Sequence, residues 1–376
     1  MERIKKAFLK DSSVNVLSSF LAVAVGLIVG FVILLISNPS QAAGGFGAIL
    51  RGGFADMRSM GQVLYIATPI IMTGLSVGFA ARTGLFNIGA SGQFIMGAYA
   101  AILVGVKCSA FLPGITLCIA AMIAAMIAGA VWGSISGMLK AYCNVNEVIA
   151  CIMMNYIGMY LVNFLIVHTV FDSLRNQSMS VPGNANLPKL GLDLIFRDGN
   201  SASSANGGIF VAVIMAVVIY IILEKTTFGF ELKACGFNRD AAKYAGINEH
   251  RSIVYSMAIA GALAGLGGAL LYLAGAGNRI DVVDVLAPEG FNGIPVALLG
   301  LNNPIGIIFS GFLIAYLTIG GFNMQLYDFA PQVIEIIIAI IIYFSAFALL
   351  LKNYIELWRM RGHRKPAAPE AEEAAT

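Results

Sequence analysis

Long apolar stretches recur along this chain of 376 residues, and they constrain its fold more than any other feature. A helix needs about 20 apolar residues to cross the hydrocarbon core of a bilayer. Charged residues make up only 11% of the chain, against roughly 25% in soluble domains. The sequence therefore predicts an all-α polytopic membrane protein with spans near 17–36, 63–80, 84–106, 112–139, 148–168, 208–223, 253–276, 304–320 and 332–351.

A tenth apolar segment, 288–301, is shorter and is interrupted by Gly290, Gly293 and Pro295. Such a segment is either a bent span or a re-entrant piece that is buried in protein. Counting it as a crossing places most of the 23 Lys and Arg residues, and both basic ends of the chain, on the cytoplasmic side. Because cytoplasmic loops carry the excess of positive charge, we expect about ten transmembrane helices, with a broken segment near 288–301.

The chain is expected to form one transmembrane domain, 17–351, between a cytoplasmic N-terminus, 1–16, and a cytoplasmic, partly disordered tail, 352–376. The hydrophilic stretch 171–206 is rich in Ser, Asn, Gly and Pro, which is typical of a loop, and we place it outside the cell. The basic residues gather at cytoplasmic edges, which indicates membrane orientation and contact with lipid rather than a nucleic-acid partner.

A second hydrophilic stretch, 224–252, is basic and is placed in the cytoplasm. It contains the helix-forming run 239–245, which is followed by Gly246. A glycine directly after a helix-forming run is a common helix end. The sequence therefore predicts a short helix at the cytoplasmic face.

Neutral hydrogen-bonding side chains and aromatic rings, rather than charges, occupy the predicted spans. Glycines on both sides of Asn292 favour irregular backbone lining a cavity. Glycines also flank Asn87, so we expect both amides to have a functional role. Amides, hydroxyls and phenols suit a small neutral polar solute with hydroxyls and a flat ring. The alternative is hydrogen bonding between helices that only stabilises the bundle. The residues that we expect along a solute path are Asn87, Ser91, Gln93, Asn155, Tyr156 and Asn292.

The energy for transport is expected to come from another subunit. A carrier driven by protons or sodium usually has an ionisable side chain at membrane depth. Within the ranges 84–106, 109–139, 148–171, 208–223, 252–278 and 290–327 the only Asp, Glu, Lys, Arg or His is His168. The chain also lacks the GxxxxGK[ST] motif that cradles phosphates. We therefore expect a transport subunit without its own ATPase site, and we disfavour a stand-alone secondary carrier.

An intramembrane serine protease is an alternative from another class. The run from Gly89 to Gly92 reads Gly-Ala-Ser-Gly, which matches the GxSG pattern of rhomboid-type proteases. Catalysis there needs a histidine base beside the serine, and the histidines lie at a helix end, in the 224–252 stretch and in the tail. The five cysteines form no CxxC pair, so neither a metal site nor a disulfide framework is expected. No cofactor is expected in this chain.

Four motifs in order resemble those of a known family. They are Ala-Arg-Thr-Gly-Leu-Phe-Asn-Ile-Gly-Ala-Ser-Gly-Gln at 81–93, Asn-Glu-Val-Ile at 146–149 with Met-Asn-Tyr at 154–156, Gly-Phe-Asn-Arg-Asp-Ala-Ala-Lys-Tyr-Ala-Gly-Ile at 236–247, and Gly-Phe-Asn-Gly-Ile-Pro-Val-Ala-Leu-Leu-Gly at 290–300. The set resembles the bacterial permeases of the ribose, nucleoside and branched-chain amino-acid ABC importers.

Within that family the chain looks closest to the nucleoside (simple-sugar-type) permeases, whose first motif reads GLFNIGxxGQ. Ser91 stands where many relatives carry Glu, so a simple sugar or a branched-chain amino acid stays an alternative solute to a nucleoside. The resemblance implies a multi-pass protein of the bacterial cytoplasmic membrane. It also implies three partners: an ABC ATP-binding subunit that binds the ATP, a second permease subunit and an extracytoplasmic solute-binding protein.

The resemblance also implies that the stretch 236–247 couples the permease to the ATPase. A short amphipathic segment in the longest basic inner loop fits the groove of a partner. The residues assigned to this coupling are Gly236, Asn238, Arg239, Ala241, Ala242, Tyr244, Gly246 and Ile247.

Overall fold

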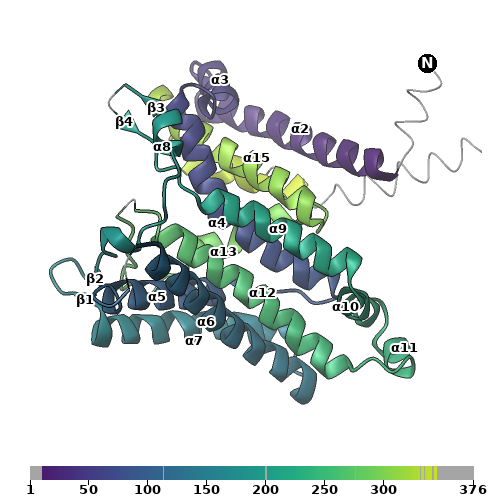
Figure 1. The fold of residues 1–376 in the computed structure, drawn as a ribbon. Coiled ribbons are helices and arrows are strands. Elements are labelled where there is room, and N and C mark those ends of the chain that lie inside the picture. The colour runs from purple at the N-terminus through teal and green to yellow at the C-terminus, as the bar shows by residue number, and fades with distance from the viewer. Residues whose placement is uncertain are drawn as a thin grey trace, which may run out of the picture.

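The protein is a bundle of long helices in the computed structural model, which describes residues 11–344 apart from 113, 200, 276, 331, 334, 341 and 342 (Figure 1). The helices are α2 (Asp11–Ser37), α3 (Ala42–Gly52), α4 (Met57–Arg82), α5 (Ala90–Lys107), α6 (Gly114–Cys143), α7 (Glu147–Thr169), α8 (Leu192–Ile195), α9 (Gly208–Lys225), α10 (Thr227–Phe237), α11 (Arg239–Tyr244), α12 (Glu249–Tyr272), α13 (Pro288–Phe291), α14 (Gly293–Leu299) and α15 (Pro304–Asn323).

Four short strands are the extended elements of the described residues. Strand β1 (Phe171–Asp172) pairs antiparallel with β2 (Gln177–Ser178), and β3 (Arg197–Asp198) pairs antiparallel with β4 (Ser201–Ala202). Both hairpins belong to the stretch 171–206, at the end of the bundle opposite to α10 and α11 (Figure 1). The two hydrophilic stretches therefore lie at opposite ends of the bundle.

The expected all-α membrane fold is confirmed. Seven of the described helices, α4, α5, α6, α7, α9, α12 and α15 with the turn that follows it, are long and apolar enough to cross a membrane. A shorter apolar segment, Val23–Ser37, lies within α2. The chain is a multi-pass membrane protein.

The last predicted span, 332–351, is helical at residues 332, 333, 335–340, 343 and 344. Its remaining residues lie outside the part of the chain that the structure describes. The same holds for residues 1–10 of the predicted N-terminal segment and for the whole predicted tail, 352–376.

Helix α12 forms the centre of the bundle and packs against α4, α5 and α6. Glycines allow its backbone to touch those of its neighbours: a Cβ atom on Gly129 of α6 would lie 2.2 Å from the carbonyl oxygen of Gly261. On another face, a Cβ atom on Gly97 of α5 would lie 2.3 Å from the Cα atom of Gly265. Small residues let membrane helices approach this closely, so these contacts set the distances between the central helices.

The broken segment that the sequence predicts near 288–301 is confirmed as two short helices, α13 and α14, which meet at Asn292. It runs beside α4 in the same direction: Gly293 lies against Thr73 and Gly74, and Asn302 lies beside Gly78. Helix α15 then returns along the same face of α4, with Ile307 against Gly74 and Gly78.

Two helices of 11 residues, α3 and α10, were not expected from the sequence, nor was the four-residue helix α8 in the predicted loop 171–206. Helix α3 lies in the stretch between the first two predicted spans and packs against α15, where a Cβ atom on Gly52 would lie 2.6 Å from the Cα atom of Gly320. Helix α10 precedes the predicted short helix 239–245, which the structure places at Arg239–Tyr244 as α11. Helices α3 and α10 have 11 residues each, which is too few to cross a bilayer. Transmembrane spans are recognised by apolar runs of about 20 residues, so this criterion does not detect either helix.

The contact between α6 and α12 predicts a stability difference between two glycine-to-alanine variants. In Gly129→Ala the new methyl group meets the Gly261 carbonyl, whereas in Gly47→Ala of α3 it meets nothing within 4 Å. Overpacking of a tight core costs about 1–3 kcal/mol, so we expect Gly129→Ala to lower the Tm of the detergent-solubilised protein. Gly47→Ala is the matched control and should leave the Tm unchanged or raise it slightly; equal Tm values for the two variants would contradict this packing.

Candidate functional site

The turn between α4 and α5 carries the first predicted polar residues into the interior of the bundle. Helix α4 ends at Arg82, and Gly84 with a φ of +75° turns the chain, a conformation that glycine adopts without steric cost. The following residues are not helical until Ala90. This irregular run places Asn87 in the core, where it is 0% exposed.

Asn87 and Gln93 form a reciprocal pair of amides. The Nδ2 atom of Asn87 donates to Oε1 of Gln93 at 2.8 Å, and Nε2 of Gln93 donates to Oδ1 of Asn87 at 3.0 Å. Asn87 Nδ2 also donates to the hydroxyl oxygen of Ser76 at 3.1 Å, and the Cys151 thiol lies 3.9 Å from Asn87 Oδ1. Each of these polar side chains is buried and has a partner, as buried amides require.

Two further predicted residues continue this buried polar group. Asn155 of α7 accepts from the backbone N–H of Gly92 at 2.8 Å and donates to the carbonyl oxygen of Ile88 at 3.0 Å. Ser91 donates to the carbonyl oxygen of Ala287, just before α13, at 2.8 Å. We call Asn87, Ser91, Gln93 and Asn155 the buried amide cluster; it joins α4, α5 and α7 to the broken segment.

The structure places the other two predicted path residues on exposed faces. Tyr156 is 47% exposed on α7, and Asn292 is exposed between α13 and α14. Asn292 is close to the buried amide cluster in space, because Gly290 packs directly against Ser91. The broken segment therefore has one face on the cluster and another face that is accessible.

Two polar side chains at this site were missed by sequence reasoning. Ser76 is a single hydroxyl within the apolar run of α4, and nothing in the sequence distinguishes it from a packing residue. Glu289 lies at the start of the broken segment, one residue before the range 290–327, which has no Asp, Glu, Lys, Arg or His. Its position beside an interrupted apolar segment is a signal that could have identified it.

The predicted coupling stretch forms the end of α10, all of α11 and the start of the link to α12. The side chain of Asn238 caps α11 by accepting from the Ala241 N–H at 3.0 Å, and Gly246 with a φ of +85° follows the helix end. Ala242 is only 4% exposed, so it packs within the loop. Most of the stretch is exposed, with Arg239 and Ile247 half-buried; the exposed residues include Gly236, Asn238, Ala241, Tyr244 and Gly246.

Two aromatic rings stand out on this exposed surface: Phe237 is 90% exposed and Tyr244 is 95% exposed. Lys243 and Asp240 lie beside them and are also exposed. Exposed aromatic residues that are rimmed by charge are typical of a protein–protein contact. The coupling stretch thus has the surface character of a docking site.

The coupling stretch touches the α4–α5 turn through backbone. A Cβ atom on Gly84 would lie 2.5 Å from the Cα atom of Gly236, and one on Gly236 would lie 2.6 Å from the carbonyl carbon of Thr83. The hydroxyl groups of Thr83 and Ser256 also form a hydrogen bond. The turn that carries Asn87 is therefore in direct contact with α10.

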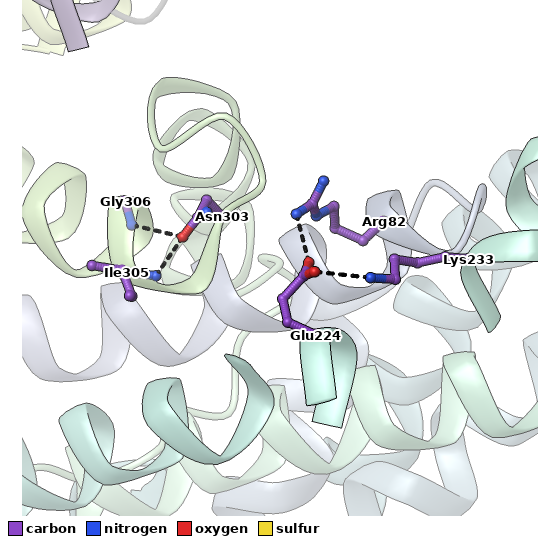
Figure 2. A network of polar contacts seen from close by, with 6 residues as sticks. All are labelled: Arg82, Glu224, Lys233, Asn303, Ile305 and Gly306. Carbon is purple, nitrogen blue, oxygen red and sulfur yellow. Dashed lines mark hydrogen bonds and ion pairs between the residues drawn. The ribbon is translucent and has the colours of Figure 1, made fainter. Parts of the chain in front are cut away.

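Ion pairs join the same elements at their surface (Figure 2). The carboxylate of Glu224, at the end of α9, lies 3.0 Å from the Arg82 guanidinium and 3.0 Å from the Lys233 ammonium. Figure 2 also shows Asn303 capping α15, where its side chain accepts from the N–H groups of Ile305 and Gly306 at 3.0 and 3.4 Å. A partly exposed ion pair contributes little stability by itself. Together, however, Arg82, Glu224 and Lys233 fix α10 against the ends of α4 and α9.

Comparison with known proteins identifies a family model that matches residues 59–346 and is described as "Branched-chain amino acid transport system / permease component". The guanosine ABC transporter permease protein NupP of Bacillus subtilis is 39% identical over 333 residues, which is 88% of this chain and 93% of that protein. The nucleoside ABC transporter permease protein NupB of Lactococcus lactis is 33% identical over 90% of this chain and 92% of its own length.

A glucose ABC transporter permease protein of Haloferax volcanii is also 33% identical, over 89% of this chain and 88% of its own length. No solved structure matches the chain significantly. The similar proteins thus include permeases for nucleosides and for a sugar, each aligned along most of its length.

The buried amide cluster predicts different outcomes for two leucine variants. Asn87→Leu removes the partner of Gln93 and of Ser76, and a buried polar group without a partner costs about 1–3 kcal/mol. We therefore expect Asn87→Leu to lower the Tm of the detergent-solubilised protein. Asn292→Leu changes an exposed side chain and should leave the Tm within the range of the wild type. A Tm for Asn87→Leu as high as that of Asn292→Leu would contradict the reciprocal amide pair.

Proposed function

Because the chain belongs to the family of branched-chain amino acid transport system permease components, we propose that it is the transmembrane permease subunit of an ATP-binding-cassette importer whose solute is a nucleoside. The observation that carries the proposal is the 39% identity to a guanosine permease, which extends over 88% of this chain. The alignment with a second nucleoside permease covers a similar share of the chain.

Three partners complete the proposed transporter in the bacterial cytoplasmic membrane: an ATP-binding subunit, a second permease subunit and an extracytoplasmic solute-binding protein. The names of the similar proteins support an ABC transporter assembly. The absence of a GxxxxGK[ST] motif in the sequence supports the assignment of ATP binding and hydrolysis to a partner rather than to this chain.

The solute path is proposed to pass the broken segment and the buried amide cluster. Discontinuous helices near the middle of a transporter commonly form the solute site, and here α13 packs on Ser91 of the cluster. The amides of Asn87, Gln93 and Asn155 bind protein groups in this conformation. Opening of the path would exchange some of these partners for hydroxyls or ring nitrogens of the solute. Tyr156 and Asn292 offer an aromatic ring and an amide on exposed faces nearby.

Coupling to ATP hydrolysis is proposed to enter through α10 and α11. Phe237 and Tyr244 supply exposed aromatic rings, and Arg239 and Lys243 supply positive charge, to a groove of the ATP-binding subunit. Motion of α10 would then reach the α4–α5 turn through the contact between Gly236 and Gly84. Because this contact is made by backbone, a displacement of α10 passes to the turn without being absorbed by a flexible side chain.

A sugar permease is the second candidate, since the Haloferax volcanii glucose permease is aligned with this chain at 33% identity. Sugars and nucleosides share hydroxyl groups, and neutral amides bind both. A nucleoside additionally has a flat base, which the aromatic rings near the path would stack against.

Uptake by the complete transporter separates the two candidates. We expect proteoliposomes with the permease pair, the ATP-binding subunit and the solute-binding protein to take up labelled guanosine when ATP is supplied. Excess unlabelled nucleosides should compete with this uptake, and excess glucose or leucine should not. Uptake of glucose without uptake of guanosine would favour the sugar candidate and contradict the nucleoside proposal.

Coupling through α11 is tested by Ala241→Glu, because Ala241 is exposed and the new side chain does not disturb the loop itself. A glutamate in the first turn of a helix is favourable for the helix. An unpaired charge buried at an interface costs roughly 2–5 kcal/mol, so we expect ATP-dependent uptake to fall by roughly tenfold or more, or the ATP-binding subunit to dissociate.

The matched control for this variant is Leu194→Glu, since Leu194 is 73% exposed at the opposite end of the bundle. It should transport normally. Ala242→Glu is a poorer test. Ala242 is buried within the loop, so a loss of uptake in that variant could come from disrupted packing of the loop rather than from lost contact with the ATP-binding subunit. Normal uptake by Ala241→Glu, in a complex that retains its ATP-binding subunit, would place the coupling surface elsewhere.

A further inference from the structure

Glu289 differs in position from the other charged residues near the membrane-spanning helices. In the long apolar helices of the described chain, Asp, Glu, Lys, Arg and His residues lie in the first or last turn. Glu289 also lies in the first turn of its helix, α13, but this helix begins beside the middle of α4 and not at an end of the bundle. Its neighbour Gly290 packs so closely that a Cβ atom there would lie 2.2 Å from the Cα atom of Ser91. The carboxylate is thus carried by a segment that is wedged between α4 and α5.

The surroundings of Glu289 are aromatic rather than cationic. Tyr65 of α4 and Tyr272 at the end of α12 lie within electrostatic range of its carboxylate, and both rings are half-buried. The carboxylate interacts with its own backbone N–H. Among the described residues, no other group forms a hydrogen bond or an ion pair with it. A carboxylate can accept about four hydrogen bonds, so most of this capacity is open to a ligand.

The exposed face of the broken segment is polar. Asn292 follows Glu289 by three residues in helical backbone, so both side chains lie on the same face. Asn292 is exposed and Glu289 is half-buried. Interrupted helices at membrane depth are tolerated only where they are buried in protein or line a water-filled space, and a charged side chain facing hydrocarbon is costly. This face therefore borders water and not lipid.

We propose that Glu289 binds the solute in the translocation path by accepting hydrogen bonds from a pair of donors on a nucleoside. This inference rests on the proposed function, and it adds a charged residue to a path that the sequence predicts to be neutral. The two oxygens of a carboxylate receive two parallel donors with good geometry. A nucleoside offers such a pair on the guanine base, at N1–H and the 2-amino group, and another in the 2′ and 3′ hydroxyls of ribose.

The same carboxylate would give the path a selectivity that neutral amides alone would not give. Nucleotides carry phosphate groups, and a like charge in the path disfavours them by repulsion. Tyr65 and Tyr272 lie within electrostatic range of the carboxylate and would supply aromatic rings to a bound base. Glu289 thus favours an uncharged solute that has paired donors and an aromatic ring.

The test is Glu289→Gln in the complete transporter, with initial uptake rates of guanosine, inosine and 2′-deoxyguanosine. Inosine lacks the 2-amino group of guanosine, and 2′-deoxyguanosine lacks one ribose hydroxyl. A hydrogen bond to a charged group contributes about 1.5–3 kcal/mol, so we expect the KM for guanosine to rise by roughly tenfold to a hundredfold, with little change in kcat. If Glu289 binds the base, the variant should lose the difference in KM between guanosine and inosine. If it binds the ribose, the variant should lose the difference in KM between guanosine and 2′-deoxyguanosine.

The control is Asp198→Asn, an exposed carboxylate in the β3–β4 hairpin, which should leave all three KM values unchanged. An unchanged guanosine KM in Glu289→Gln, or an equal loss of kcat for all three solutes without a change in preference, would overturn the inference. If the complex with Glu289→Gln does not assemble, Glu289→Asp is the deciding variant. It keeps a carboxylate, so it should raise the KM for guanosine and keep the preference among the three solutes. An unchanged KM for guanosine in Glu289→Asp would overturn the inference. A wild-type complex that takes up no nucleoside would instead refute the proposed function, and this inference with it.

Discussion

Close contact between helix backbones, made possible by glycine, is the constraint on which the rest of this structure depends. In a bilayer the hydrophobic effect does not drive one apolar helix onto another, so packing and hydrogen bonding must do so. The pairs Gly129–Gly261 and Gly97–Gly265 bring α6 and α5 onto α12. Similar contacts recur where function is proposed, at Gly84–Gly236 and at Gly290–Ser91. Close backbone contacts at glycine thus hold the bundle together. They also link the coupling stretch and the broken segment to the buried amide cluster.

Polar side chains are distributed according to what the bilayer tolerates. Charges lie at helix ends and in the hydrophilic stretches, for example at Glu224 with Arg82 and Lys233 (Figure 2). Inside the bundle the amides of Asn87 and Gln93 bind each other, because a buried polar group without a partner is costly. Glu289 lies in the first turn of α13, but that helix begins beside the middle of α4, and this position is the reason to assign Glu289 to a water-filled path.

Much of the architecture could be predicted from the sequence. The apolar runs, the interruption near 288–301 and the short helix that ends before Gly246 are all local signals, and each of these elements that falls within the described residues is present in the structure. Helices α3 and α10 could not be predicted in this way, because they are short and are stabilised by contacts with remote segments, such as α3 with α15. The outcome is similar at the candidate site: Asn87, Ser91, Gln93 and Asn155 were named from the sequence and lie together in the structure, whereas Ser76 and Glu289 were not named.

The sequence by itself determined that the chain is a multi-pass membrane protein with a broken segment, that it carries the motifs of an importer permease, and that it lacks the GxxxxGK[ST] motif. These properties are local, since apolar length and motif spacing are read along the chain. Only the tertiary structure decided that Asn87 is paired with Gln93 in the core, that Asn292 is exposed and that Ala242 is buried. The physical reason is that exposure and pairing depend on how helices far apart in the sequence cross, and the close backbone contacts at glycines set those crossings.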